Sequence, residues 1–267
     1  MITMSRLACR FLLLLPLVTA LTPVPASTPE ARAHIQANIE AEAAKDEKTS
    51  VRITLSNAQG KVQERTLHWT TITLPSGDKR SLVVFDLPKA IRGTGLLTHE
   101  NTTSDDERWL YLPALKKTRR ISGSDKSDTF MGTDFAYEDL VTEEPEKYDY
   151  TFPAIQDCGP TCVKVIAVPA TEQEKRESGY ARREITLDTR THMVLAVEYF
   201  NKAGIHAKSY KASEFQTVHP NGALRPFRME MVDLLNQHTT VMLFEGYHID
   251  TGVSESDVSQ RALTQGR

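Results

Sequence analysis

Apolar residues recur at every second position from about residue 49 almost to the C-terminus. Val51, Ile53 and Leu55 begin this pattern and alternate with polar residues. The period is typical of β-strands that have one face in a core, because successive side chains of a strand point to opposite sides of the sheet. Short clusters of turn-forming residues, such as 75–78 and 202–204, separate the runs. They predict hairpins between neighbouring antiparallel strands.

The alternation and its breaks predict about 11 to 12 strands in a mainly β fold. After the run at 51–55, strands are expected over residues 61–74, 80–88, 93–99, 106–113, 116–122, 146–152, 161–169, 180–188, 191–200, 205–215, 224–233 and 238–248. Because no linker-like stretch and no repeat divides these runs, we expect one continuous antiparallel sheet. A sheet of this size must curl to remain stable, which creates a concave face.

Helices are expected near the two ends of the domain. Thr28 and Pro29 fit the N-cap and the first position of a helix that reaches Ala44. Ser254 and Asp257 have the spacing of a capping box, which predicts a short helix near the C-terminus.

The first 26 residues have the features of a secretory signal peptide. Arg6 and Arg10 precede an apolar run at 11–18, and Ala26 is a small residue suited to cleavage. A membrane anchor is the alternative, but the run is shorter than the ~20 residues that a span needs. We therefore expect a mature domain of residues 27–267 that is free in the periplasm.

The mature chain is mildly acidic. Without the leader it has 30 Lys and Arg against 35 Asp and Glu. Because binding to phosphate backbones requires a basic surface or stripe, nucleic acid is not an expected partner.

Two cysteines remain after the leader, at Cys158 and Cys162. An even count in an exported chain favours a disulfide, although the intervening Gly-Pro leaves a redox-active pair open. No second Cys or His pair stands nearby, so neither a metal site nor another cofactor is expected.

Several strands are apolar on both faces, most clearly at 82–85, 109–112 and 241–244. Both faces of such strands must be covered. The expected helices are too short to cover both sides of so many strands. Either a non-protein ligand fills the difference, or the sheet folds back on itself into a packed barrel.

Four motifs follow one another between Arg92 and Leu140. They are Arg-Gly-Thr-Gly at 92–95, Trp-Leu-Tyr-Leu-Pro-Ala-Leu at 109–115, Arg-Arg-Ile-Ser at 119–122 and Met-Gly-Thr-Asp-Phe-Ala-Tyr-Glu-Asp-Leu at 131–140. Together they resemble the outer-membrane lipoprotein-sorting family with a LolA-like fold. The resemblance extends more weakly over most of the mature chain.

This resemblance implies an incomplete (half) β-barrel whose concave side is covered by short helices, as in the lipoprotein carriers LolA and LolB. By the same similarity, lipid or lipoprotein acyl chains are the expected ligands, and an inner-membrane transporter of the resistance-nodulation-division (RND) class is the expected partner. Cys158 and Cys162 lie outside the family pattern, and the chain lacks the lipidation cysteine of LolB.

Two aromatic residues in the motifs are candidates for the cavity wall. Trp109 and Tyr111 share one face of their strand, and large flat side chains suit an acyl ligand. Ordinary core packing is the alternative.

Arg119 and Arg120 are candidates for binding a headgroup. In a strand they point to opposite faces, so one guanidinium could meet a phosphate or carboxylate on the concave side. The alternative is an ion pair with a carboxylate such as Asp134 or Asp139.

The stretch 124–140 is a candidate lid. It contains Phe130, Met131, Phe135 and Tyr137, and flexible apolar side chains of this kind repack readily around a variable ligand. The alternative is a small cluster beneath a loop.

The sequence contains no nucleophile elbow, zinc-protease motif or phosphate loop. We therefore expect a carrier rather than an enzyme. A non-carrier accessory subunit of an envelope transporter is the main alternative, and a lipid hydrolase is the third.

Overall fold

The computed structural model describes residues 27–265, so the expected signal peptide lies outside the described residues. One antiparallel sheet of 13 strands dominates the fold, which confirms the expected class with slightly more strands than predicted. The strands are β1 (Asp46–Ser56), β2 (Val62–Thr73), β3 (Lys79–Leu87), β4 (Gly95–Glu100), β5 (Glu107–Leu112), β6 (Lys117–Ile121), β7 (Tyr148–Thr151), β8 (Cys162–Pro169), β9 (Tyr180–Asp188), β10 (Val194–Asn201), β11 (His206–Thr217), β12 (Leu224–Asp233) and β13 (His238–Ile249). The helices are α1 (Pro29–Ala41), α2 (Glu172–Glu177) and α3 (Gln260–Gln265).

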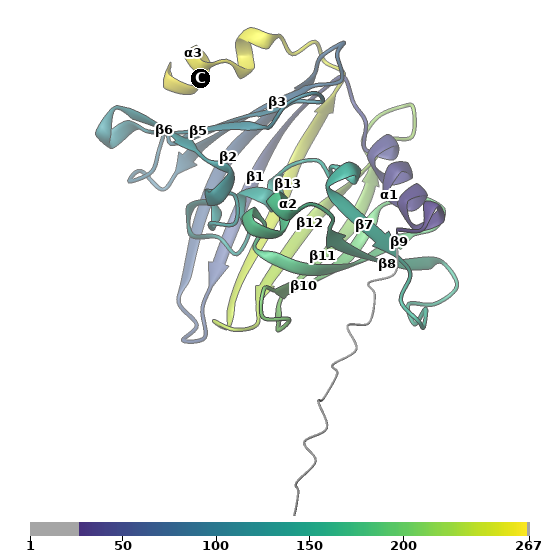
Figure 1. The fold of residues 1–267 in the computed structure, drawn as a ribbon. Coiled ribbons are helices and arrows are strands. Elements are labelled where there is room, and N and C mark those ends of the chain that lie inside the picture. The colour runs from purple at the N-terminus through teal and green to yellow at the C-terminus, as the bar shows by residue number, and fades with distance from the viewer. Residues whose placement is uncertain (1–26, 266–267) are drawn as a thin grey trace, which may run out of the picture.

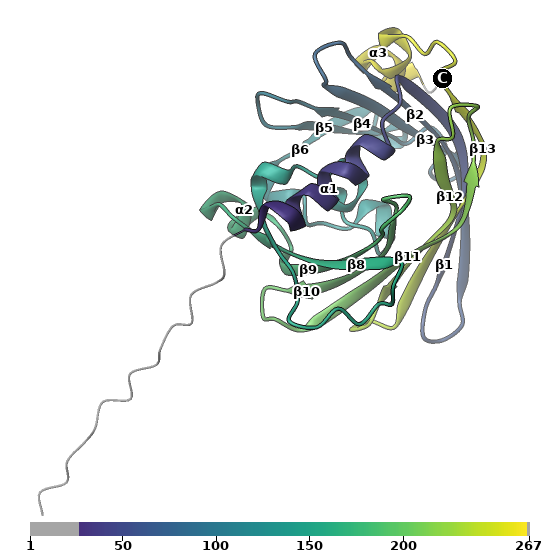
Figure 2. The same ribbon diagram turned by 90° about the vertical axis from the view of Figure 1, so that its right-hand side faces the viewer.

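The sheet is an open half-barrel, and its two edge strands follow one another in the sequence. Its order is β6-β5-β4-β3-β2-β1-β13-β12-β11-β10-β9-β8-β7, so the first and last strands pair while β6 and β7 are the free edges. Figure 2 shows the sheet curving around α1. In Figure 1 the same curve is seen with α1 above β7 at the right of the picture.

Residues 122–147 join the two free edges and lie against the concave side; we call them the cover segment. They contain short 3₁₀ turns, including Phe130–Gly132 and Tyr137–Leu140, rather than a long helix. The expected lid at 124–140 falls within this segment.

Apolar side chains on the two sides of the sheet form two separate clusters. In β3, Val83 and Phe85 belong to an inner cluster that also contains residues of α1 and the cover segment. Leu82 and Val84 point to the opposite side, where they meet Leu263 of α3 in an outer cluster. Protein therefore covers both faces of this strand, which explains its two-sided apolar pattern.

The ends of the domain follow the local signals in the sequence. Pro29 begins α1 after Thr28, although the Thr28 side chain makes no capping hydrogen bond. Ser254 and Asp257 form the expected capping box at a 3₁₀ turn, Glu255–Val258, that precedes α3. Cys158 and Cys162 form a disulfide. No helix between residues 27 and 265 is long and apolar enough to cross a membrane.

Candidate functional site

The concave side contains a cavity of about 350 Å³, which we call the inner cavity. Its floor is formed by strands on both sides of the β1–β13 pairing, and its roof by the end of α1 and residues 138–143 of the cover segment. The volume is at the lower end of the ~300–1,000 Å³ range of small-molecule sites.

About half of the residues that line the inner cavity are apolar, and most of these lie on the strands of the floor. Aromatic and methionine side chains from five different strands face it, together with Phe135 of the cover segment. These side chains are Trp69, Tyr199, Tyr210, Met229, Met242, Phe244 and Tyr247. Such a wall can accept an extended hydrocarbon, and methionine adapts its shape to what it contacts.

Charged groups gather at one end of the inner cavity. Arg225 is buried and donates through Nε to Glu47 at 2.8 Å and through a terminal nitrogen to the carbonyl of Glu42 at 3.0 Å. Lys79 donates to Thr142 of the cover segment at 2.9 Å. The cavity is therefore amphipathic: apolar side chains line much of its floor, and charged side chains lie at this polar end and in the roof.

An ion pair joins the cover segment to the sheet between two cavities. The two terminal nitrogens of Arg183 donate to the two oxygens of Glu143 at 2.8 and 2.7 Å, and the hydroxyl of Tyr150 donates to the same carboxylate at 2.6 Å. The Arg183 guanidinium also lies 4.3 Å from the centre of the Tyr148 ring. This packing fixes the planar guanidinium in the orientation that two-point pairing needs.

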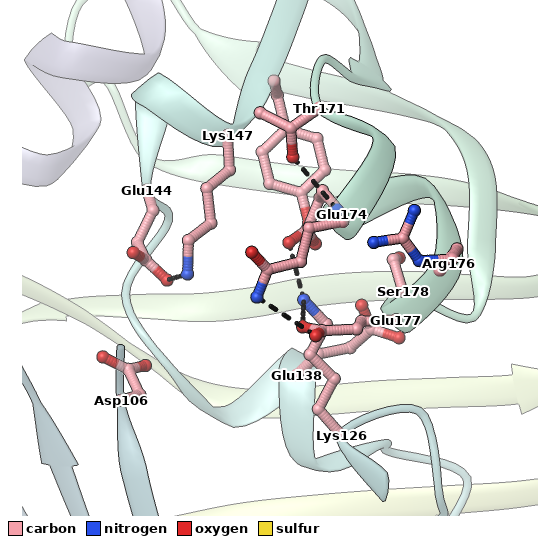
Figure 3. A network of polar contacts seen from close by, with 12 residues as sticks. Asp106, Lys126, Glu138, Glu144, Lys147, Thr171, Glu174, Arg176, Glu177 and Ser178 are labelled. Atoms are coloured by element: carbon pink, nitrogen blue, oxygen red, sulfur yellow. Dashed lines mark hydrogen bonds and ion pairs between the residues drawn. The ribbon is translucent and has the colours of Figure 1, made fainter. Parts of the chain in front are cut away.

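A second cavity, of about 370 Å³, lies on the other side of residues 138–143 and is mainly polar. Figure 3 shows part of its wall, where Lys126 of the cover segment meets Glu174 of α2 at 2.6 Å. The Tyr148 hydroxyl donates to the other oxygen of Glu174 at 2.7 Å, and Lys147 donates to Glu144 at 2.7 Å. Most charges in this wall are thus already paired with one another.

Glu138 is the strongly perturbed acid at the boundary of the two cavities. Burial and the neighbouring Asp139 raise the pKa of its carboxyl to about 7, against the hydrogen bond that it accepts from the Gly179 amide at 2.8 Å. Burial also raises the pKa of Asp139. The boundary therefore carries less negative charge near neutral pH than its sequence indicates.

The structure places Trp109 and Tyr111 away from the expected cavity wall. Both pack against the outer cluster beneath α3, whereas Leu110 between them belongs to the inner cluster. Trp109 and Tyr111 share a face of β5, as the alternation predicts, but that face is the convex one. Trp69 is the tryptophan that lines the inner cavity.

The two candidate arginines lie at the edge strand β6 and are exposed. Arg119 pairs with Asp125 at 3.1 Å and Arg120 with Glu107 at 2.9 Å, so neither meets Asp134 or Asp139. Arg120 contributes to the polar cavity, and neither arginine lines the inner cavity.

The aromatic residues of the expected lid are buried in the inner cluster. Phe130 packs on Phe85 with ring centres 5.7 Å apart and on Tyr137 at 5.8 Å. Phe135 contacts Tyr210 at 6.2 Å and lines the inner cavity. Met131 lies at the border of the same cluster. These residues are part of the main core rather than of a separate small cluster.

The described residues include two groups of a serine, a histidine and an acid. In the first, Ser209 lies 3.1 Å from Nε2 of His206 and Glu198 lies 2.6 Å from the same nitrogen. In the second, Ser50 lies 3.1 Å from Nδ1 of His68 and Asp86 lies 3.0 Å from Nε2. In a catalytic triad the acid and the nucleophile bind different ring nitrogens, so the first group lacks that relay, whereas the second has it at an exposed histidine. Neither group lines the inner cavity or the polar cavity. Within residues 27–265 no three His, Cys, Asp or Glu side chains gather as a metal site.

Known structures share this architecture. A domain described as an outer membrane lipoprotein-sorting protein, from Vibrio parahaemolyticus, is 27% identical over 88% of this chain and 98% of its own, with a TM-score of 0.80. A DUF1329 family protein from Desulfovibrio piger is 25% identical over 88% of this chain and 100% of its own, with a TM-score of 0.79. A LolA superfamily protein from Nitrosomonas europaea is 14% identical over 87% and 98% of the two chains, with a TM-score of 0.66, and shows the fold alone.

Sequence comparison adds the family assignment. No curated protein sequence matches the chain significantly. A family model described as an uncharacterized protein matches residues 77–265, which is more than half of the chain. The chain therefore belongs to this family, and it has the LolA-like half-barrel of the outer-membrane lipoprotein-sorting proteins that it resembles.

Proposed function

We propose that the protein is a periplasmic carrier that binds a lipid or lipoprotein acyl chain in the inner cavity. The observation that supports this most is the amphipathic wall of that cavity. A hydrocarbon can lie along Trp69, Met242 and Phe244, while the polar end near Arg225 meets the headgroup or the linkage of the chain. Apolar walls with a few fixed polar groups are typical of such sites.

A carrier needs no catalytic group, and the lining of the inner cavity contains no nucleophile that is paired with a base. The proposal is therefore a binding function rather than an enzymatic one. By similarity to the Vibrio domain, which is described as lipoprotein-sorting, transport to or at the outer membrane is the proposed role. An RND-class transporter is the proposed partner, on the basis of the family resemblance of the motifs at 92–140. The same proposal includes removal of residues 1–26 during export. The mass of the protein purified from the periplasm tests this, because it should equal that of residues 27–267.

The two tryptophans of the chain allow a direct test of the cavity. Trp69 lines the inner cavity and Trp109 packs under α3. Trp109→Phe leaves Trp69 as the fluorophore, and Trp69→Phe leaves Trp109. Titration with a fatty acid brominated along its chain should quench the Trp109→Phe protein strongly and the Trp69→Phe protein weakly, because heavy-atom quenching requires contact.

Equal quenching of both variants, or no saturable quenching, would contradict binding in the inner cavity. Mass spectrometry of organic extracts from protein purified without detergent then identifies the natural cargo. An accessory subunit without cargo would yield no lipid and would still copurify with the transporter, which separates the two functions.

A further inference from the structure

The connections between strands fall on two opposite rims of the half-barrel. One rim contains the loops 57–61, 88–94, 113–116, 202–205 and 234–237, and we call these five loops the basic rim. The register places three of them side by side, because Ser56 of β1 is opposite Thr239 of β13 and Lys208 of β11 is opposite Asp233 of β12. Loops 88–94 and 113–116 are neighbours of each other, and they are set back from the 57–61 tip because Leu87 is opposite Thr66. In Figure 1 the tips of the β1–β2 and β12–β13 hairpins lie together at the lower end of the sheet.

The basic rim carries positive charge only. Its five loops contain five cations and no acid, although the whole chain has a net charge of −3. All five cations are exposed: Lys61, Lys89, Arg92, Lys116 and Lys202. The two acids next to the loops already have partners within the protein. Asp86 pairs with His68 at 3.0 Å, and Asp233 accepts hydrogen bonds from the amides of Leu235 and Asn236.

The opposite rim, which we call the acidic rim, has the reverse charge. Its loops 74–78, 101–106, 152–161, 189–193 and 218–223 contain four acids and one cation. The α2 connection, residues 170–179, lies on the same rim as the five basic loops, where Lys202 donates to the Arg176 carbonyl, and it contains three acids and two cations. Charge is thus separated along the strand direction of an acidic protein.

The basic rim also concentrates exposed apolar side chains. Between residues 27 and 265, eight large hydrophobic side chains are exposed, and six lie on or directly beside the basic-rim loops. These six are Val62, Leu87, Leu115, Ile205, Leu234 and Leu235, with Leu115 at 62% and Leu235 at 55% exposure. Phe152 and Ile155, the other two, are on the opposite rim. Exposed apolar groups that gather with one sign of charge mark an interaction surface.

We propose that the basic rim docks on the surface of an anionic phospholipid bilayer. Lysine and arginine are attracted to anionic headgroups, while leucine and isoleucine at loop tips insert into the boundary between headgroups and acyl chains. The polar end of the inner cavity, near Lys79 and Arg225, lies by the opposite rim. Docking in this orientation leaves that end facing away from the bilayer. The inference does not depend on which cargo the cavity binds.

Cosedimentation of the purified protein with vesicles tests this surface. The protein should bind vesicles of equimolar phosphatidylglycerol and phosphatidylcholine, and binding should fall with salt and be lost on phosphatidylcholine alone. Lys116→Gln should weaken binding about fivefold, and Leu235→Ser about tenfold. Ile155→Ser is the matched control, because Ile155 is 75% exposed on the acidic rim; this variant should bind as the wild type does.

Absence of binding to the anionic vesicles would overturn the proposal and favour a protein partner for the rim. Equal loss in Ile155→Ser and Leu235→Ser, or no loss in both rim variants, would also overturn it. All substituted side chains are exposed, so melting curves should coincide and separate lost docking from lost folding. A lack of vesicle binding would not change the tryptophan-quenching result, so the docking proposal and the carrier proposal are tested independently.

Discussion

The carboxylate of Asp134 lies 2.7 Å from Nδ1 of His238, joining the middle of the cover segment to the first residue of β13. The Thr240 hydroxyl donates to the same carboxylate at 2.7 Å, and Lys208 donates to the Asp134 carbonyl at 2.8 Å. Asp134 and Thr240 are both buried. Asp134 is thus one of the residues that hold the cover segment against the sheet, together with Glu143.

Removal of this anchor should destabilise the fold. Asp134→Ala leaves the buried Thr240 hydroxyl and the His238 ring without their acceptor, and we expect the free energy of unfolding to fall by about 3 kcal/mol. Urea unfolding measures the change. Asp128→Ala, at an exposed position of the same segment, is the control and should change stability by less than about 0.5 kcal/mol. Similar losses in the two variants would argue against the anchor.

The Arg183–Glu143 pair should show strong coupling. Arg183→Met leaves the Glu143 carboxylate partly buried without its cation, which should cost about 3 kcal/mol, whereas Arg183→Met combined with Glu143→Leu should recover much of that loss. Unfolding of both single variants and the double variant completes the cycle. Additive effects would show that the pair contributes little beyond its separate contacts.

Glu138 should make stability depend on pH. Its pKa is raised to about 7 in the folded protein from an ordinary value of 4.5, so the folded state retains a proton that the unfolded state releases. Its contribution is therefore greatest below pH 4.5 and is lost as pH rises to about 7, by up to about 3 kcal/mol.

Glu138→Gln isolates this contribution, because it keeps an oxygen to accept from the Gly179 amide while removing the titration. Unfolding curves from pH 5 to pH 8 should show a weaker fall with pH in the variant, and greater stability than the wild type at pH 8. Because Asp139 is coupled to Glu138, the difference between the two proteins measures the titration of Glu138 together with its effect on Asp139. An unchanged slope would indicate that Glu138 has an ordinary pKa.

The disulfide closes a very short loop, so its effect should be small. Replacing Cys158 and Cys162 by Ser is expected to lower the free energy of unfolding by up to about 2 kcal/mol, since the entropy removed from the unfolded chain rises only slowly with loop length. The loop lies on the acidic rim and touches neither cavity. Fatty-acid binding should therefore remain as in the wild type, and a change in binding would reveal a role for this loop in the carrier function.

Strand positions could be predicted well because their signals are local. Alternation and turn-forming residues placed the strands at 162–169, 180–188 and 224–233 within a residue or so of their observed bounds. The pairing of β1 with β13 and the opening between β6 and β7 depend on contacts between distant residues. Alternation carries no information on those contacts, so the half-barrel came from the family resemblance.

The walls of the cavity were harder to predict. Alternation shows that Trp109 and Tyr111 share a face, but where both faces are apolar it does not show which one is concave. The sequence does not single out Trp69, because His68 and Thr70 flank it in a mostly polar strand. Its position two residues from Leu67, which is buried, is the signal that places it on the same face. The ion-pair partner of Arg120, in turn, depends on the register of β6 against β5, where Glu107 lies diagonally opposite.

The seam between β1 and β13 divides the sheet into two units that are each continuous in sequence. Strands β1–β6 and β7–β13 meet only where residues such as Val51 and Phe244 pair. The first unit therefore has no partner for its β1 edge until the last strand has been synthesised. A chain with this topology must be kept from aggregating until residue 249 is available to pair, and its two units are natural fragments for reassembly from separate peptides.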